Sequence, residues 1–412
     1  MTTLKTTHLQ QEKIVLTIVL AELLLGGSGR VLAFGPLSIR ILILIGLLCY
    51  EVLLLFKNKI IAKQSNLLLI CILLDFAVML IYSIPNNDIP SAIDTFSGYI
   101  VIAVCPVFVY LFGENGELLN SARKVLYFCT ILLSLITYAL WSISLFLRIG
   151  GLLNTLQYGG LAYIGSIPRL FLKGSIFICC ALFFSVSDFI LLRKAKYLLL
   201  SIMYTLAIIM TFTTSFYVFT ALIILFILYI LIGKQHFVRF LVGGIIIGAV
   251  GLLVIYKLGI INVFIERFSG DYNFSYKGIQ LLTILENVLQ RPVFGHGFGY
   301  IIKVDYGYIV KNIYSFEVMW AQLLLDTGIV GTVLFVSHVM LTLHKLHNKF
   351  KLTGASVFLA FELSVIMICL VSFTNPFMNN AIGLMFYAIC VGIAEIDIEK
   401  LIHIEGGVLQ NG

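Results

Sequence analysis

A small set of charged side chains in this sequence could bind an anionic group and accept a proton. Arginine presents a planar fork of N–H donors that suits phosphate or carboxylate, and lysine adds a point charge. A carboxylate or a neutral imidazole can accept a proton from a hydroxyl group. The candidate anion-binding residues are Arg169, Arg267, Arg291 and Lys277, and the candidate proton acceptors are Glu317 and His296. These side chains can act together only if the elements that carry them meet.

Composition places those elements in a membrane. The chain has 412 residues, of which 60% are apolar and 11% charged, and its mean hydropathy is +1.07. An ordinary soluble domain is about 45–50% apolar and about 25% charged. The composition therefore excludes a soluble enzyme, a secreted disulfide-linked domain and a disordered chain. The long apolar runs also exclude an outer-membrane barrel, whose strands alternate apolar and polar residues.

The apolar runs predict an all-α polytopic integral membrane protein with about 12 transmembrane helices. Their approximate limits are 14–26, 37–56, 66–84, 96–112, 124–147, 170–192, 197–213, 216–232, 240–257, 318–343, 354–374 and 378–394. We expect four regions along the chain. They are a bundle of the first nine helices at 1–257 with an outer loop at 148–169, a large loop at 258–317, the last three helices at 318–394, and a tail at 395–412.

The basic residues predict which side of the membrane each loop occupies. If the spans alternate, both termini share one face, and this face carries 16 of the 27 basic residues. The positive-inside rule makes that face cytoplasmic. The opposite face holds six of the nine arginines but only five of the eighteen lysines. These arginines could bind phosphate or carboxylate, or could anchor helix ends at lipid headgroups; they are Arg30, Arg40, Arg148, Arg169, Arg267 and Arg291.

The loop at 258–317 is too long for a simple connection, which predicts a functional role. Between Lys277 and Gln290 the apolar residues fall on one helical face and the polar residues on the other. This pattern indicates an amphipathic helix at the membrane interface. A glycine-rich turn follows, and its glycines permit either a tight turn or a close approach of backbone N–H groups to a ligand. The glycines are Gly295, Gly297 and Gly299.

Two segments, RPVFGHGFG at 291–299 and EVMWAQLLLDTGIVG at 317–331, together resemble the O-antigen polymerase and ligase superfamily of bacterial envelope glycan assembly. That superfamily carries a Pro-x-x-Gly-x-Gly-x-Gly signature in an outer loop. A helix with a His-Asn start, an acidic residue and two glycines follows it. Here Glu317 stands at the position of the ligase histidine, Asp326 at the acid, and Gly328 and Gly331 at the glycines.

Departures from the family pattern favour one branch. Glu317 in place of the ligase histidine is similar to the polymerases. The arginine that usually opens the amphipathic helix corresponds to Lys277, and Arg169 resembles the phosphate-binding arginine of the earlier outer loop. The Ser-Arg-Gly pattern of the ligases corresponds at best to 214–216, where arginine is absent. We expect Asp326 to orient an arginine rather than to transfer a proton.

The resemblance implies a GT-C-like membrane glycosyltransferase. It would polymerise undecaprenyl-pyrophosphate-linked repeat units into O-antigen or a related surface polysaccharide on the periplasmic face. An O-antigen ligase, which moves glycan to a lipid A core sugar, is the nearest alternative. A lipid-linked oligosaccharide flippase is an alternative of another class. It should carry cations deep in the membrane, whereas this chain gathers them at one surface.

The resemblance also implies roles for the site residues. No Asp-x-Asp pair, which many glycosyltransferases use to hold a metal, occurs in an outer loop. We therefore expect a metal-independent enzyme without a cofactor, in which cationic side chains stabilise the leaving pyrophosphate. Arg169, Arg267 and Arg291 would do this with help from Lys277, and either Glu317 or His296 would be the base. Asp326, Gly295, Gly297 and Gly299 would support the site.

The same resemblance implies the surroundings of the protein. The expected partners are the lipid-linked glycan donor and acceptor, membrane lipid and a chain-length regulator protein, with no nucleic acid. We expect the chain in the bacterial inner membrane, with both termini cytoplasmic and the active site periplasmic.

Overall fold

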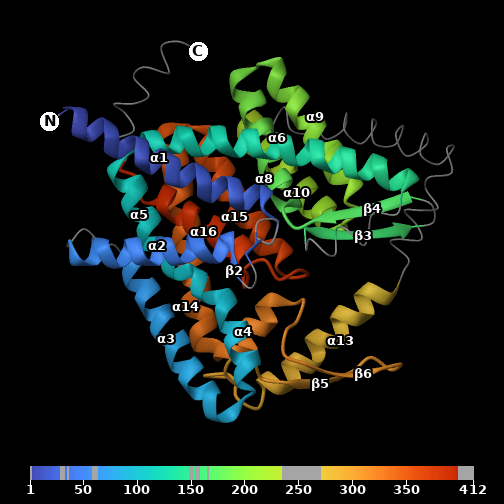
Figure 1. Ribbon diagram of the computed structural model, residues 1–412. Coiled ribbons are helices and arrows are strands. Elements are labelled where there is room, and N and C mark those ends of the chain that lie inside the picture. The colour runs from blue at the N-terminus through green and yellow to red at the C-terminus, as the bar shows by residue number, and fades with distance from the viewer. Residues whose placement is uncertain are drawn as a thin grey trace. The chain divides into compact units, whose positions relative to one another are not determined.

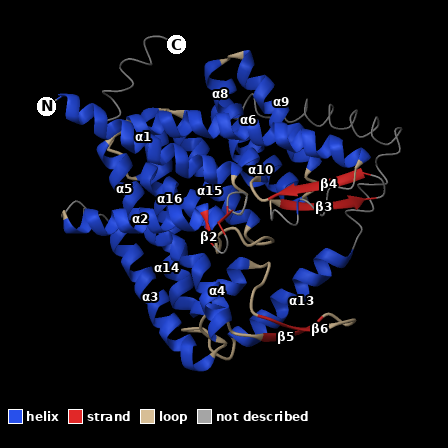
Figure 2. Ribbon diagram, viewed as in Figure 1, coloured by secondary structure: helices blue, strands red, loops and turns tan. Residues whose placement is uncertain are grey.

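The computed structural model describes residues 2–27, 33–34, 37–57, 64–147, 153, 158–164, 167–233 and 271–397. These residues are mainly helical, with three short antiparallel hairpins (Figures 1 and 2). Within them, seven helical stretches are long and apolar enough to cross a membrane. The prediction of a helical, polytopic membrane protein is therefore confirmed. The predicted span at 240–257 lies outside the described residues.

The chain separates into two compact units. Unit 1 comprises Met1–Leu23, Leu32–Val125 and Phe274–Gly412, and unit 2 comprises Leu24–Val31 and Leu126–Asn273. Of the candidate site residues, Arg169 belongs to unit 2. The two segments of the family resemblance, at 291–299 and 317–331, both belong to unit 1.

Unit 1 is built around helices that are buried along most of their length. Helix α16 packs against α5 and η1, and α14 packs against α3, α15 and α16. Nearly every residue of α16 is apolar and buried, so this helix forms part of the core rather than a lipid-facing surface. The elements of this unit are α1 (Thr2–Leu25, in its greater part), β1 (Ala33–Phe34), β2 (Leu37–Ser38), α2 (Ile39–Phe56), α3 (Gln64–Asn86), α4 (Ile89–Tyr99), η1 (Ile100–Val104), α5 (Cys105–Glu114), the start of α6 (Glu117–Phe146), α13 (Asp271–Val288, in its greater part), β5 (Ile302–Asp305), β6 (Val310–Ile313), α14 (Met319–Thr353), α15 (Ser356–Val371) and α16 (Ala381–Ala394).

Unit 2 contains the remainder of α6, the hairpin of β3 (Gly159–Ile164) and β4 (Ile167–Leu172), and helices α8 (Ser175–Leu192), α9 (Ala195–Met210) and α10 (Thr214–Ile232). Helix α8 packs against α9 and α10. The prediction of a helix from residue 170 is wrong at its start. Residues 167–172 alternate between partly exposed and buried positions as a strand, and the helix begins only at Ser175.

Two predicted helices are interrupted, each for an identifiable reason. The span predicted at 96–112 consists of α4, η1 and α5, because Pro106 has no N–H to bond to Ile102 and Cys105 bonds there instead. Helix α14 is kinked at Gly328, whose φ of 63° and ψ of −165° are not helical. The amphipathic helix predicted at 277–290 is α13, which begins earlier, at Asp271, and ends at Val288.

Candidate functional site

The glycine-rich segment 291–299 lies directly against the kink of α14. The N–H groups of His296 and Gly297 donate to the carbonyls of Leu325 and Asp326, at 2.8 and 3.0 Å. In the other direction, the N–H groups of Ile329 and Val330 donate to Pro292 and Val293, at 2.8 and 3.2 Å. The kink exposes backbone groups that a regular helix would bond internally, and the segment satisfies them. The two parts of the family resemblance are thus one structural unit.

Asn87, at the end of α3, holds the same segment from its other side. Its Nδ2 donates to the carbonyls of His296 and Phe298, at 3.0 and 2.9 Å. The Phe298 ring is fully buried among aromatic rings of α3 and α4, whose centroids lie 5.6–5.8 Å away. This contact anchors the segment, because burial of a phenylalanine removes a large apolar area from water. The surrounding residues are Phe76, Phe96 and Tyr99.

His296 is buried and engaged on several sides. The residue is only 6% exposed, and its Nε2 lies 2.8 Å from the carbonyl oxygen of Asn287. Since a carbonyl can only accept, Nε2 carries the proton. The ring stacks on Tyr300 with centroids 4.2 Å apart. Burial, with a smaller contribution from the Arg291 charge, lowers the pKa of His296, so the neutral ring is favoured.

Glu317 and Lys277 form an ion pair at the surface of unit 1. Glu317 Oε2 and Lys277 Nζ are 2.9 Å apart, and the two side chains are 49% and 25% exposed. Lys277 also donates to the carbonyl of Thr374. The backbone N–H of Glu317 donates to Gln280 Oε1 at 3.2 Å, so α13 fixes the start of α14 through two contacts. A half-exposed carboxylate beside an ammonium group is accessible to a ligand and can accept a proton.

Tyrosine rings border this ion pair. Tyr276 and Tyr306 stack with centroids 4.3 Å apart and an interplanar angle of 4°, and Gln280 Nε2 donates to the Tyr306 hydroxyl group at 3.1 Å. Burial is the largest cause of a rise in the pKa of Tyr306 to about 12. Tyr306 therefore remains a neutral phenol at physiological pH. Gln280 links this stack to Glu317.

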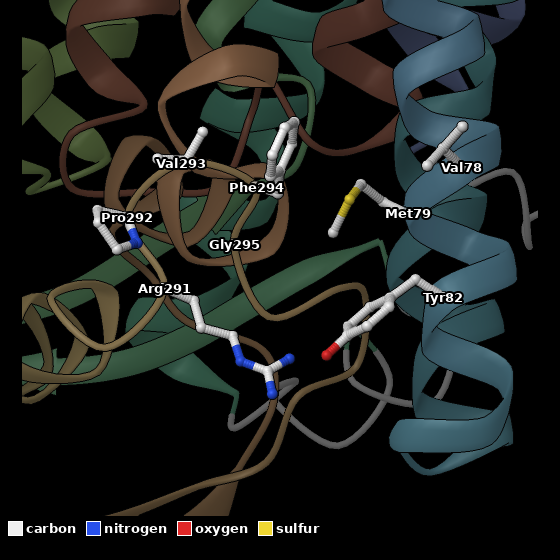
Figure 3. A pocket seen from close by; sticks show the side chains of 8 residues that line it. All are labelled: Val78, Met79, Tyr82, Arg291, Pro292, Val293, Phe294 and Gly295. Carbon is white, nitrogen blue, oxygen red and sulfur yellow. The ribbon is translucent and has the colours of Figure 1, made fainter.

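Arg291 occupies a different place, beyond the end of α13. Its guanidinium group lies over the Tyr82 ring, 5.6 Å from the centroid, at one side of a groove of about 610 Å³ (Figure 3). Eleven residues separate Lys277 from Val288, a rise of about 16 Å at about 1.5 Å per residue, and Arg291 follows in the next turn. Lys277 and Arg291 therefore mark opposite parts of α13. The groove is lined by Val78, Met79, Tyr82, Arg291, Pro292, Val293, Phe294 and Gly295.

Asp326 is buried beneath the glycine-rich segment. The residue is 1% exposed, and its Oδ2 has no hydrogen-bond partner among the described residues. We expected it to orient an arginine, but it forms no ion pair in the described part of unit 1. Its backbone carbonyl, rather than its carboxylate, contacts the segment through Gly297.

The other arginines of the predicted outer face have separate positions. Arg40 pairs with Glu22, with Nη2 and Oε1 2.9 Å apart and both side chains 9% exposed, so its charge is neutralised inside unit 1. Arg169 lies in β4 of unit 2, opposite Ala162. Arg30, Arg148 and Arg267 lie outside the described residues. The structure thus brings together Lys277 with Glu317. It also places His296, Gly295 and Gly297 against the backbone of α14 at 325–328, whereas Gly299 lies against the backbone of α4.

Three polar residues that position the site were not predicted from the sequence. Asn87 and Gln280 make side-chain bonds to segments far along the chain, and Tyr82 lies beneath Arg291. The sequence pattern between Lys277 and Gln290 predicts only that Gln280 lies on the polar face of an amphipathic helix. No local spacing distinguishes such residues, because their partners come from other elements.

The comparisons with known proteins point to the same kind of protein as the two motif segments. No family model matches the chain. A protein of Shigella flexneri named O-antigen polymerase is 27% identical to it over 391 residues, which cover 92% of this chain and 94% of that protein. The resemblance first seen at 291–331 therefore extends far beyond those residues. The chain is similar, along almost its whole length, to an O-antigen polymerase.

Proposed function

We propose that this protein is a membrane glycosyltransferase that polymerises undecaprenyl-pyrophosphate-linked repeat units into O-antigen or a related surface polysaccharide. In this proposal it acts on the periplasmic face of the inner membrane. The observation that carries the proposal is the half-exposed Glu317–Lys277 pair. It occupies the family's motif position in a chain similar to an O-antigen polymerase over 92% of its length.

Glu317 is the proposed general base. The acceptor's sugar hydroxyl attacks the anomeric carbon of the donor glycan, and its proton passes to the Glu317 carboxylate. The new bond joins the hydroxyl oxygen to the anomeric carbon. The bond from that carbon to the pyrophosphate oxygen breaks, and its electron pair leaves with the pyrophosphate. Glu317 suits this role better than His296, whose Nε2–H is committed to Asn287 and whose ring is buried.

Lys277 is the proposed first contact of the leaving pyrophosphate. An ammonium group has three N–H donors, and Lys277 directs donors to Glu317 and to the Thr374 carbonyl. A remaining donor can face an anion next to the base. Stabilising charge as it develops on the leaving group lowers the barrier to transfer. Roles for Arg169 and Arg267 in this stabilisation remain predictions from the sequence, and no metal ion is required in this scheme.

Surface polysaccharide from a strain lacking its own polymerase tests the function. The intact protein should restore a ladder of long chains, and Glu317→Gln should leave core capped with a single repeat unit. Glu286→Gln, an exposed acid on the same helix α13, is the matched control and should restore the ladder. Bare core with accumulated lipid-linked polymer in a strain from which only the gene for this protein is deleted would identify a ligase instead. A normal ladder from Glu317→Gln, at equal membrane level, would reject the site.

A further inference from the structure

The groove beside Arg291 is apolar along its walls and carries charge at one place. One wall is a face of α3 that includes Val78 and Met79, and the opposite wall is the segment that includes Val293 and Phe294. Figure 3 shows Met79 and Phe294 on facing sides, with the Arg291 guanidinium group near the Tyr82 hydroxyl group. Phe294 and Val78 are largely exposed, so apolar surface is open to a ligand. Such a surface fits a hydrocarbon chain with an anionic group at its end.

The charge of Arg291 is available for that anionic group. Among the described residues, Arg291 forms no ion pair, and its guanidinium group lies over the face of the Tyr82 ring. A guanidinium group over an aromatic ring keeps N–H donors free at its edge. These donors can bind a phosphate while the ring holds the plane of the group in place.

The segment that forms one wall is fixed by the fold. Carbonyls of Pro292 and Val293 accept from α14, and Gly295 lies against the kink at Gly328. The opposite wall is a continuous helix. A groove held in this way needs little rearrangement to receive a ligand, which favours binding.

The position of the groove indicates which substrate it serves, and this step rests on the proposed function. A donor's pyrophosphate is attached to the carbon that reacts, so it must lie beside the base. An acceptor's pyrophosphate is separated from its reacting hydroxyl by the whole repeat unit. Lys277, which pairs with Glu317, lies in the first half of α13, and Arg291 follows the last residue of that helix. The two cationic side chains are therefore attached about 16 Å or more apart along the helix axis. That separation leaves room for sugars between the two groups.

We infer that this groove binds the lipid end of the acceptor substrate. Arg291 contacts the phosphate nearest the lipid, and the first units of the prenyl chain lie against Val78, Met79 and Phe294. The repeat unit then extends along α13 toward Glu317. The protein on this account has separate places for the pyrophosphates of donor and acceptor.

Binding of undecaprenyl phosphate to the full-length protein in lipid nanodiscs tests the groove, with native mass spectrometry as the readout. Arg291→Gln and Val78→Trp should each lower retention at least tenfold. Ile84→Trp, an exposed position on another face of α3, should not change it. Unchanged retention in both groove variants would overturn the inference. An equal loss of phosphatidylglycerol retention in the two groove variants would also overturn it, because the groove would then be a general lipid surface.

Transfer kinetics test the assignment to the acceptor. Arg291→Gln should raise KM at least tenfold for a lipid-linked repeat unit and leave KM unchanged for the same oligosaccharide released from its lipid. A rise in the KM of the donor instead would overturn the assignment. Glu317→Gln should abolish transfer yet retain undecaprenyl phosphate. If the intact protein shows no transfer, the proposed function and the acceptor assignment both fail, while the binding measurement still decides whether the groove holds a lipid phosphate.

Discussion

Gly295 and Gly328 approach each other so closely that neither position has room for a side chain. A Cβ on Gly295 would lie 2.6 Å from the Gly328 nitrogen, and a Cβ on Gly328 would lie 2.5 Å from the Gly295 nitrogen. Both residues also have positive φ, at 71° and 63°. The contact joins the glycine-rich segment to the kink of α14, so the lipid groove and the start of α14 depend on one backbone junction.

Gly328→Ala should open this junction. The φ and ψ of Gly328 fall in a region that is essentially restricted to glycine. An alanine held there would cost about 1–3 kcal/mol in backbone strain, and the steric overlap of its Cβ would add to that cost. We expect a lower thermal midpoint and faster hydrogen exchange at the His296 and Gly297 amides. Gly278→Ala on α13 has open space around it and should be neutral or slightly stabilising. Equal exchange rates in the two variants would contradict the account.

Reversing the charges of Lys277 and Glu317 should separate structure from catalysis. Each single reversal places like charges about 3 Å apart and should weaken the contact between α13 and α14. The double variant Lys277→Glu with Glu317→Lys restores attraction, so its thermal midpoint should recover. Polymerisation should stay at least a hundredfold below normal, because the base has moved. Recovery of long chains in the double variant would show that the pair acts only in folding.

The stability of the His296 junction should fall in acid. Burial lowers the pKa of His296 in the folded protein below its usual value of about 6.5. The unfolded state therefore binds more protons below that pH, and stability is lost as pH falls through the two values. Thermal unfolding at pH 7.5 and 5.5 should show a larger loss for the natural protein than for His296→Asn. An equal loss in the two proteins would contradict burial of the ring.

Asn87→Asp should release the glycine-rich segment. The variant replaces a donor facing two carbonyl oxygens with a group that can only accept when ionised. Leaving buried carbonyls without a donor costs about 1–3 kcal/mol. We expect faster hydrogen exchange over residues 295–299 and loss of undecaprenyl phosphate binding. The neighbouring Asn86→Asp, at an exposed position, is the control and should leave both properties unchanged.

Chelation should not reduce activity if cationic side chains alone stabilise the leaving group. Purified protein treated with EDTA and passed into metal-free buffer should polymerise at the rate of untreated protein. A loss of at least tenfold that Mg²⁺ or Mn²⁺ reverses would refute the metal-independent scheme.

Composition by itself determined that the chain is a helical membrane protein, because backbone groups in lipid must bond within their own helix. The motif segments at 291–299 and 317–331 could likewise be recognised without a structure. The periodicity after Lys277 predicted α13, since burial on one face repeats with the helical turn. Pro106 and Gly328 interrupt helices through local backbone chemistry, yet hydropathy alone placed continuous spans there.

Only the tertiary structure decided which residues meet. Lys277 and Glu317 are forty residues apart, and Asn87 reaches His296 across 209 residues. No spacing in the chain encodes such contacts, because they depend on how separate helices pack. The position of Arg40 in the sequence groups it with the other outer arginines, but in the structure it pairs with Glu22, which neutralises its charge. Residue type limited what each side chain could do, and packing decided which ones had a ligand-accessible charge.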